Sequence, residues 1–190
     1  MSDSLSPGFA DPVAASQTCF RAVLDALAHP GRARRVPALA APSPLSPAAA
    51  SVLLTLVDHE TPLWLDPAAA AASDWITFHT GAPMAAAARA GFALAMTLPD
   101  LGALPAGTDE SPEASATVIL QVASLSSGAR FRLAGPGLRA PALFQVDGLP
   151  DDFAARWAAN HALFPRGIDL ILCAGDTLAA LPRGITVGDA

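Results

Sequence analysis

Short apolar strand patterns alternate with helical patterns along most of the chain, and this alternation constrains the fold more than any other feature. Residues 117–122 and 168–173 are mostly apolar runs of strand length, as is typical of strands buried inside a sheet. Other segments, such as 12–28 and 150–163, carry apolar residues at helical spacing. The sequence therefore predicts a three-layer α/β fold, in which helices cover both faces of a mixed sheet.

Three helices are expected to begin at a capping residue followed by proline. The pairs Asp11-Pro12, Ser46-Pro47 and Asp66-Pro67 each combine a side chain that accepts hydrogen bonds from free helical amides with the residue favoured at the first helical position. The first helix should end at 29–31. The four prolines of segment 37–47 exclude regular structure from it.

The remaining elements follow from length and composition. We expect strands at 63–65, 75–79, 117–122, 129–133 and 168–173, and helices at 83–90 and 150–163. Ser127-Gly128 should join strand 117–122 to strand 129–133 as an antiparallel hairpin. Residues 91–96 fit a buried strand and a helical extension equally well.

The length of 190 residues favours one domain. Residues 1–10 are rich in Ser, Pro and Gly, and we expect a mobile amino-terminal arm there, followed by a single α/β domain over 11–190. The start of the chain lacks the basic and apolar regions of a secretory signal, which favours the cytoplasm. A net charge of -6 argues against a nucleic-acid partner, and no apolar run approaches the roughly 20 residues of a membrane span.

All eleven positive charges are arginine, so the chain contains no lysine. This excludes chemistry that needs a Schiff-base lysine or a P-loop lysine. The four histidines have no metal-ligand spacing, and we expect Cys19 and Cys173 to be buried apolar fillers. The residues themselves therefore predict no catalytic residue, no metal ligand and no bound cofactor.

One loop carries a candidate ligand site. Gly135-Pro136-Gly137 follows a strand and is flanked by Arg132 and Arg139, so backbone amides and two guanidinium groups could meet a phosphate or another anion. The alternative is a tight turn with a purely structural role, which is favoured because Pro136 has no amide hydrogen to donate.

Three further segments allow a functional and a structural interpretation. Arg32, Arg34 and Arg35 could bind phosphate or an acidic partner, although a solvated patch or a protein contact is favoured. The segment 58–60, Asp-His-Glu, could perform acid-base work, but a helix-ending turn explains the same residues. The segment 164–169 has the composition of a loop that opens a strand, in which Asp169 holds the loop through backbone amides.

Taken in order, several short motifs resemble the PhnH family, a subunit of the bacterial carbon-phosphorus lyase system. The resemblance runs from about residue 9 to about 187, and it rests on 20–21 (Phe-Arg), 29–31 (His-Pro-Gly), 58–61 (Asp-His-Glu-Thr), 112–117 (Pro-Glu-Ala-Ser-Ala-Thr), 135–138 (Gly-Pro-Gly-Leu), 164–169 (Phe-Pro-Arg-Gly-Ile-Asp) and 181–183 (Leu-Pro-Arg). One departure is visible, because Gly184 follows Arg183 where the family usually has threonine.

The resemblance implies a cytoplasmic protein that forms a homodimer in isolation and joins the other core subunits of the complex. That system uses ATP and an alkylphosphonate to form a ribose 1-phosphonate 5-triphosphate and later splits the carbon-phosphorus bond, so it combines transferase and lyase steps. It also implies a fold similar to pyridoxal-phosphate-dependent transferases without the cofactor.

Three hypotheses follow. The first is a non-autonomous subunit in phosphonate catabolism that is not catalytic alone. The second is a phosphate-binding or nucleotide-binding enzyme subunit with its own ligand site at Arg132, Gly135, Gly137 and Arg139. The third is a dimer with a purely structural role in the complex.

Overall fold

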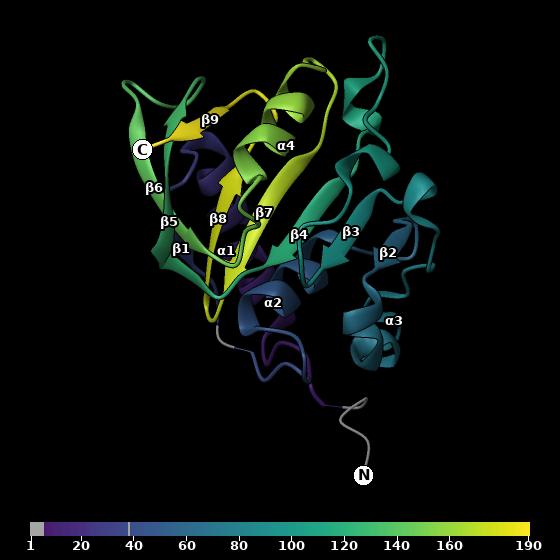
Figure 1. Ribbon diagram of the computed structural model, residues 1–190. Helices are drawn as coiled ribbons and strands as arrows, with labels where there is room; N and C mark the ends of the chain where they lie inside the picture. Colours follow the sequence, from purple (N-terminus) through teal and green to yellow (C-terminus); the bar gives the residue numbers. More distant parts are fainter. Residues whose placement is uncertain (1–5, 38) are drawn as a thin grey trace.

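The computed structural model describes residues 6–37 and 39–190, and within them the chain forms two sheets (Figure 1). The larger sheet has six strands in the order β1-β8-β7-β4-β3-β2 among the described residues, and the smaller has three in the order β6-β5-β9. The strands are β1 (Arg34–Arg35), β2 (Leu63–Leu65), β3 (Phe92–Ala95), β4 (Thr117–Gln121), β5 (Ser124–Ala134), β6 (Ala142–Asp147), β7 (Asp169–Ala174), β8 (Thr177–Leu181) and β9 (Thr186–Asp189).

The helices lie between these strands along the chain. The α-helices are α1 (Pro12–Ala28), α2 (Pro47–Leu56), α3 (Ser73–Thr80) and α4 (Phe153–His161). Short 3-10 helices are η2 (Pro67–Ala72), η3 (Ala87–Arg89), η4 (Leu101–Ala103) and η5 (Pro112–Ala114).

The three predicted helix caps are confirmed. The side chain of Asp11 accepts a hydrogen bond from the amide of Ala14 at 3.1 Å, and that of Ser46 accepts one from the amide of Ala49 at 3.2 Å. Asp66 does the same for the first turn of η2. Each cap satisfies an amide that has no partner within its own helix.

Strand β4 lies inside the larger sheet, between β7 and β3, and its residues Val118, Ile119 and Leu120 are all fully buried. It pairs in parallel with β3 on one side and with β7 on the other, and β3 pairs in parallel with β2. Strands β8 and β1 add antiparallel pairs at the other side of the sheet. The predicted α/β fold with a mixed sheet is therefore confirmed.

Two cores fill the space on either side of the larger sheet. Helices α1, α2 and α3 bury one face, with Cys19, Leu53 and Trp75 among the buried side chains. On the other face Phe153 and Trp157 of α4 pack together with Phe131 of β5. Helices do contribute to both faces, but the smaller sheet shares the second face with α4, which the sequence pattern did not predict.

The expected strand at 75–79 is wrong, because these residues form most of helix α3. Burial overrides the strand propensity of Trp, Ile and Thr here. Trp75 and Ile76 are fully buried, and together with the buried Ala72 they form one side of the helix. The spacing of 72, 75 and 76 is helical, and the left-handed Gly81 ends the helix.

The expected hairpin between 117–122 and 129–133 is also wrong. Strand β4 has a partner on each side within the larger sheet, whereas β5 crosses into the smaller sheet and pairs with β6 and β9. The two strands differ in pattern, because β4 is apolar at successive positions while β5 alternates exposed Arg130 and Arg132 with buried Phe131 and Leu133. Alternation is the pattern of a sheet with one solvated face.

Two other segments differ in detail from expectation. Of the helix expected at 83–90, only the short η3 forms, and Leu63 of β2 bridges to Met84 before it. Residues 91–96, for which strand and helix were both open, contain strand β3. Strands β1, β6, β8 and β9 were not predicted.

Half of the expected mobile arm, residues 1–5, lies outside the described residues. In the described half, the carbonyl oxygen of Ser6 accepts hydrogen bonds from Trp75 Nε1 at 2.9 Å and from His79 Nε2 at 3.0 Å. Phe9 packs against the core formed with α1 to α3. Mobility of the arm and the single-domain boundary stay predictions. None of the described helices is long and apolar enough to cross a membrane.

The two thiols lie where the sequence predicts, because Cys19 and Cys173 are both free and buried. Burial raises the pKa of the Cys19 thiol and raises that of the Cys173 thiol still further. Since the thiolate is the reactive form, we expect both cysteines of the folded protein to react with an alkylating agent at pH 8 at least about tenfold more slowly than in the unfolded chain. Mass spectrometry of timed samples measures this, and rapid modification of either thiol in the folded protein would contradict it.

Candidate functional site

The starts of four parallel strands meet in one row at the upper edge of the larger sheet in Figure 1. Leu63 of β2 pairs with Phe92 of β3, Phe92 with Thr117 of β4, and Thr117 with Asp169 of β7. The motif segments 58–61, 112–117 and 164–169 lead into three of these strands. The fold therefore brings together, at the amino-terminal edge, motifs that are far apart in the sequence.

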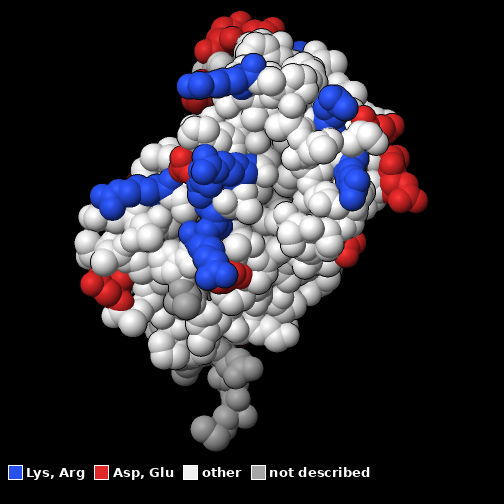
Figure 2. Space-filling view, turned by 90° about the vertical axis from the view of Figure 1, so that its left-hand side faces the viewer, with Lys and Arg blue, Asp and Glu red and all other residues white. Residues whose placement is uncertain are grey.

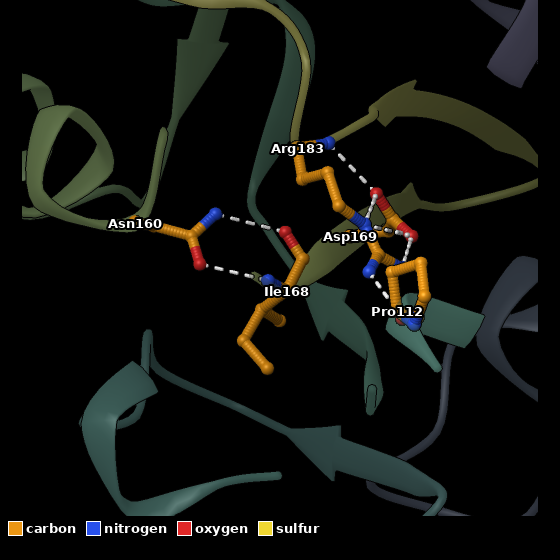
Figure 3. Close-up of polar contacts among 5 residues, drawn as sticks. All are labelled: Pro112, Asn160, Ile168, Asp169 and Arg183. Atoms are coloured by element: carbon orange, nitrogen blue, oxygen red, sulfur yellow. Dashed lines mark hydrogen bonds and ion pairs between the residues drawn. The ribbon is translucent and has the colours of Figure 1, made fainter. Parts of the chain in front are cut away.

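At this edge Arg183 and Asp169 form a partly buried ion pair (Figure 3). The Arg183 backbone amide donates to Asp169 Oδ1 at 2.7 Å, and its guanidinium group donates to both carboxylate oxygens. Arg183 Nη1 also donates to the carbonyl oxygen of Pro112 at 2.7 Å. The two side chains are only 16% and 20% exposed, so little solvent screens the pair.

A second contact fixes the loop just before Asp169. The Asn160 side chain donates to the Ile168 carbonyl oxygen at 2.9 Å and accepts from the Ile168 amide at 2.7 Å, so it pairs as a backbone would (Figure 3). Its neighbour His161 hydrogen-bonds through Nδ1 to the carbonyl oxygen of Arg183 at 2.9 Å. These hydrogen bonds connect the end of helix α4 to the start of β7 and to the segment after β8. We call the contacts among Pro112, Asn160, Ile168, Asp169 and Arg183 the edge clamp.

Chemically, the edge clamp is a closed network. Asp169 and Arg183 neutralise each other, and both polar ends of the Asn160 amide have partners. Each group is therefore engaged in holding the backbone, and the arrangement suits stabilisation of loops better than proton transfer or nucleophilic attack. This agrees with the structural interpretation of segment 164–169, although Asp169 holds the amide of Arg183 rather than one in its own loop.

The opposite, carboxyl-terminal edge is where open α/β sheets usually bind ligands. Here Gln121, the last residue of β4, accepts from the amide of Ser46 at 2.6 Å and donates to the carbonyl oxygen of Pro44 at 2.8 Å. Beyond the end of β2, Asp66 accepts from the amides of Ala68 and Met96, both at 2.9 Å. The chain itself thus uses the polar side chains at these two strand ends.

A pocket of about 460 Å³ lies between α4 and the segment around η4. Its wall is mostly apolar, with Leu101, Leu104 and Leu163 among the lining residues and Arg156 and Asp100 as the charged ones. A second, smaller pocket lies beside Phe9 and His79. Among the described residues, no three His, Cys, Asp or Glu side chains gather closely enough to hold a metal ion.

The structure places the candidate ligand residues on the smaller sheet and its first turn. Arg132 lies on β5 with its side chain exposed, and Arg139 is exposed after the turn. Gly135 and Gly137 have positive φ angles of 135° and 86°. A Cβ atom at Gly137 would lie 2.4 Å from the carbonyl oxygen of Ala28. Close packing against α1 therefore explains this glycine, and ligand binding by Arg132, Gly135, Gly137 and Arg139 stays a prediction.

Three residues of the other candidate segments have structural partners. Asp58 accepts hydrogen bonds from the Thr61 hydroxyl at 2.8 Å and the Glu60 amide at 2.9 Å, and these bonds lower the pKa of its carboxyl. This supports a turn at the end of α2. Arg34 pairs with Asp25, and Arg35 lies 3.8 Å from Asp176.

Sequence reasoning missed the contact between Asp169 and Arg183, although a signal for it exists. Gly175-Asp176 lies between two apolar runs and is a two-residue hairpin signal. Strands β7 and β8 do pair in this way, with Ala174 opposite Thr177 and Leu170 opposite Leu181. Extending that register would have placed Asp169 beside the 182–183 segment.

We expect Arg183→Ala to lower the free energy of unfolding by about 3 kcal/mol, because it leaves a partly buried carboxylate without its partner. Arg156→Ala is the matched control, since Arg156 also pairs with an aspartate, Asp152, but both side chains are about half exposed. The control should cost no more than about 0.5 kcal/mol. Urea denaturation followed by tryptophan fluorescence measures both free energies, since Trp75 and Trp157 are fully buried in the folded protein. Equal costs would contradict a stabilising role of the edge clamp.

A model of the family described as bacterial phosphonate metabolism protein (PhnH) matches residues 7–188. The chain is 42% identical over 185 residues to a protein of Rhizobium meliloti (strain 1021) named alpha-D-ribose 1-methylphosphonate 5-triphosphate synthase subunit PhnH, and the match covers 94% of this chain and 92% of the relative. It is 37% identical over 172 residues to the putative C-P lyase subunit protein HtxG of Stutzerimonas stutzeri, covering 88% of this chain and 83% of that protein. The resemblance seen in the motifs is confirmed, and the chain belongs to the PhnH family of bacterial phosphonate metabolism proteins.

Proposed function

We propose that the chain is a non-autonomous subunit of the carbon-phosphorus lyase core complex, and that it supports the formation of a ribose 1-phosphonate 5-triphosphate from ATP and an alkylphosphonate. Both relatives are named as subunits, one of a ribose 1-methylphosphonate 5-triphosphate synthase and one of a C-P lyase. The other core subunits are its partners, and they supply the chemistry.

The observation that carries this proposal is the use of the polar groups at both edges of the larger sheet. At the amino-terminal edge Asp169 accepts a hydrogen bond from the Arg183 amide, and Asn160 accepts one from the Ile168 amide. At the carboxyl-terminal edge the side chains of Gln121 and Asp66 accept hydrogen bonds from backbone amides. The carboxyl-terminal edge is the one at which an α/β enzyme ordinarily turns polar groups toward a substrate. Because Gln121 and Asp66 bind the protein's own backbone there, the chain is suited to act through contacts at its surface.

We infer from the family resemblance that the fold is related to that of pyridoxal-phosphate-dependent transferases. The mixed sheet between α1 to α3 on one side and α4 on the other is compatible with this relation. The residues do not fit the cofactor itself, because its covalent attachment needs a lysine amine and all eleven basic residues are arginine.

We also propose that the isolated chain forms a homodimer through α1. Val13, Phe20 and Leu24 are 69%, 46% and 50% exposed, and their spacing of seven and four residues places them on one side of the helix. Such a stripe is self-complementary, because two antiparallel copies of α1 would bring Val13 of one copy opposite Leu24 of the other. A cytoplasmic location completes the proposal, in keeping with two free thiols.

Size-exclusion chromatography with light scattering tests both assemblies. We expect the chain alone to have about twice its mass of 19.2 kDa and to show no turnover of ATP with methylphosphonate. Co-expressed with the other core subunits, it should elute with them. A chain that never elutes with these subunits, or that converts the substrates alone, would overturn the proposed function.

The surface of the homodimer needs its own comparison. Phe20→Glu should yield a monomer, since it places a charge in the apolar stripe, whereas the control Phe78→Glu should remain a dimer. Phe78 is a suitable control because it is also an exposed phenylalanine but belongs to another helix, α3. A Phe20→Glu protein that stays dimeric would show that α1 is not the dimer surface.

A further inference from the structure

We propose that one side of the molecule, formed by the outer face of the smaller sheet and the loop between α1 and β1, docks on an acidic surface of another core subunit. This inference rests on the proposed function, since it assumes that the chain joins a complex. We call this side the arginine face and define it by Arg32, Arg130, Arg132, Arg139 and Leu143.

The arginines of this face are exposed charges without a carboxylate neighbour. Arg34, Arg35, Arg156, Arg166 and Arg183 each have an acidic partner within 4 Å. For Arg32 and the three other arginines of the face, no carboxylate among the described residues lies that close, and all four residues are exposed. Their charges are thus free for an external partner.

The sheet presents two of these charges on a regular surface. Arg130 and Arg132 lie two residues apart on β5, so their side chains share the outer face while Phe131 points into the core. Arg132 pairs in register with Leu143 of β6, which is 70% exposed. Arginine is one of the residues enriched in protein interfaces, and Leu143 adds apolar surface beside it.

Packing brings the segment after α1 to the margin of this face. A Cβ atom at Gly31 would lie 2.5 Å from Leu133 of β5, and one at Gly137 would lie 2.9 Å from Pro30. Since Leu133 is buried in the core, the 29–31 turn lies against the inner face of the smaller sheet and beside the turn that precedes Arg139, which places Arg32 at the margin of the arginine face, near Arg139. Figure 2 shows arginine side chains spread over this side of the molecule, with most acidic side chains toward its margins.

The distribution of charge favours a protein surface over one small anion. The chain as a whole carries a net charge of -6, yet this side is locally positive. Residues on one side of a strand, such as Arg130 and Arg132, are separated by about 7 Å. Arg139 follows a turn and Arg32 lies in the loop after α1, so no single phosphate group would contact all four arginines. In the turn, the amide of Leu138 bonds to the carbonyl oxygen of Gly135, and Pro136 has no amide hydrogen. Several carboxylates on a partner would satisfy the arginines separately, which sets orientation and speeds association.

The test compares two variants for binding to the purified complex of the remaining core subunits. The double variant Arg130→Glu, Arg132→Glu should raise the dissociation constant at least about tenfold. Binding by this variant should also depend less on salt concentration. The control is Arg89→Glu, because Arg89 is also exposed, has no carboxylate within 4 Å among the described residues, and lies on η3 toward the β2 side of the sheet, opposite β1. The control should bind as the unaltered chain does.

Each outcome has one meaning. Equal binding by the double variant and the unaltered chain overturns the arginine face as a docking surface, and so does equal weakening in both variants. Preserved binding together with loss of growth on phosphonate would also overturn it, because the arginines would then serve a small anionic ligand. Failure of the unaltered chain to bind the other subunits would instead overturn the proposed function. Thermal unfolding of each variant confirms that it is folded.

Discussion

The ion pair between Asp169 and Arg183 is the constraint on which the arrangement of the larger sheet depends. It joins the start of β7 to the segment after β8, and Arg183 extends the contact to Pro112 before β4. Asn160 and His161 add α4 to the same point. Because charged groups shielded from solvent are costly unless paired, this edge is stable only when all of these segments are in place together. One contact thereby coordinates elements from residues 112 to 183.

Local signals in the sequence were sufficient for much of this fold. Asp11, Ser46 and Asp66 each cap a helix that proline begins, and these are interactions within a few residues. The long-range features were harder. Trp75 was misassigned because its strand propensity is local, whereas its burial against distant segments determines the helix. The partner of β4 was misassigned because the signal that β5 belongs to a second sheet, the alternation of arginines with buried residues at 130–133, lies several residues beyond the end of β4.

The candidate sites show the same division. The turn at 135–137 was recognised, but the reason for Gly137 lies in α1, which is more than a hundred residues earlier in the chain. The edge clamp was missed although its parts were all noticed, because joining them needs the register of the β7–β8 hairpin. A prediction that had extended the Gly175-Asp176 hairpin over six residue pairs would have reached Asp169.

Membership of the PhnH family and the geometry of the edges together favour a protein that works through contacts. The edge clamp holds the protein's own backbone, while the four arginines of the arginine face have no carboxylate within 4 Å among the described residues.

The central claim is that the edge clamp is complete in the isolated chain and that partners bind elsewhere. Hydrogen exchange tests this directly, alone and with the other core subunits. The amides of Ile168 and Arg183 should exchange slowly in the isolated chain and should not change on assembly, while protection appears in β5 and the α1–β1 loop. Rapid exchange of these two amides in the isolated chain, followed by protection only in the complex, would contradict the claim.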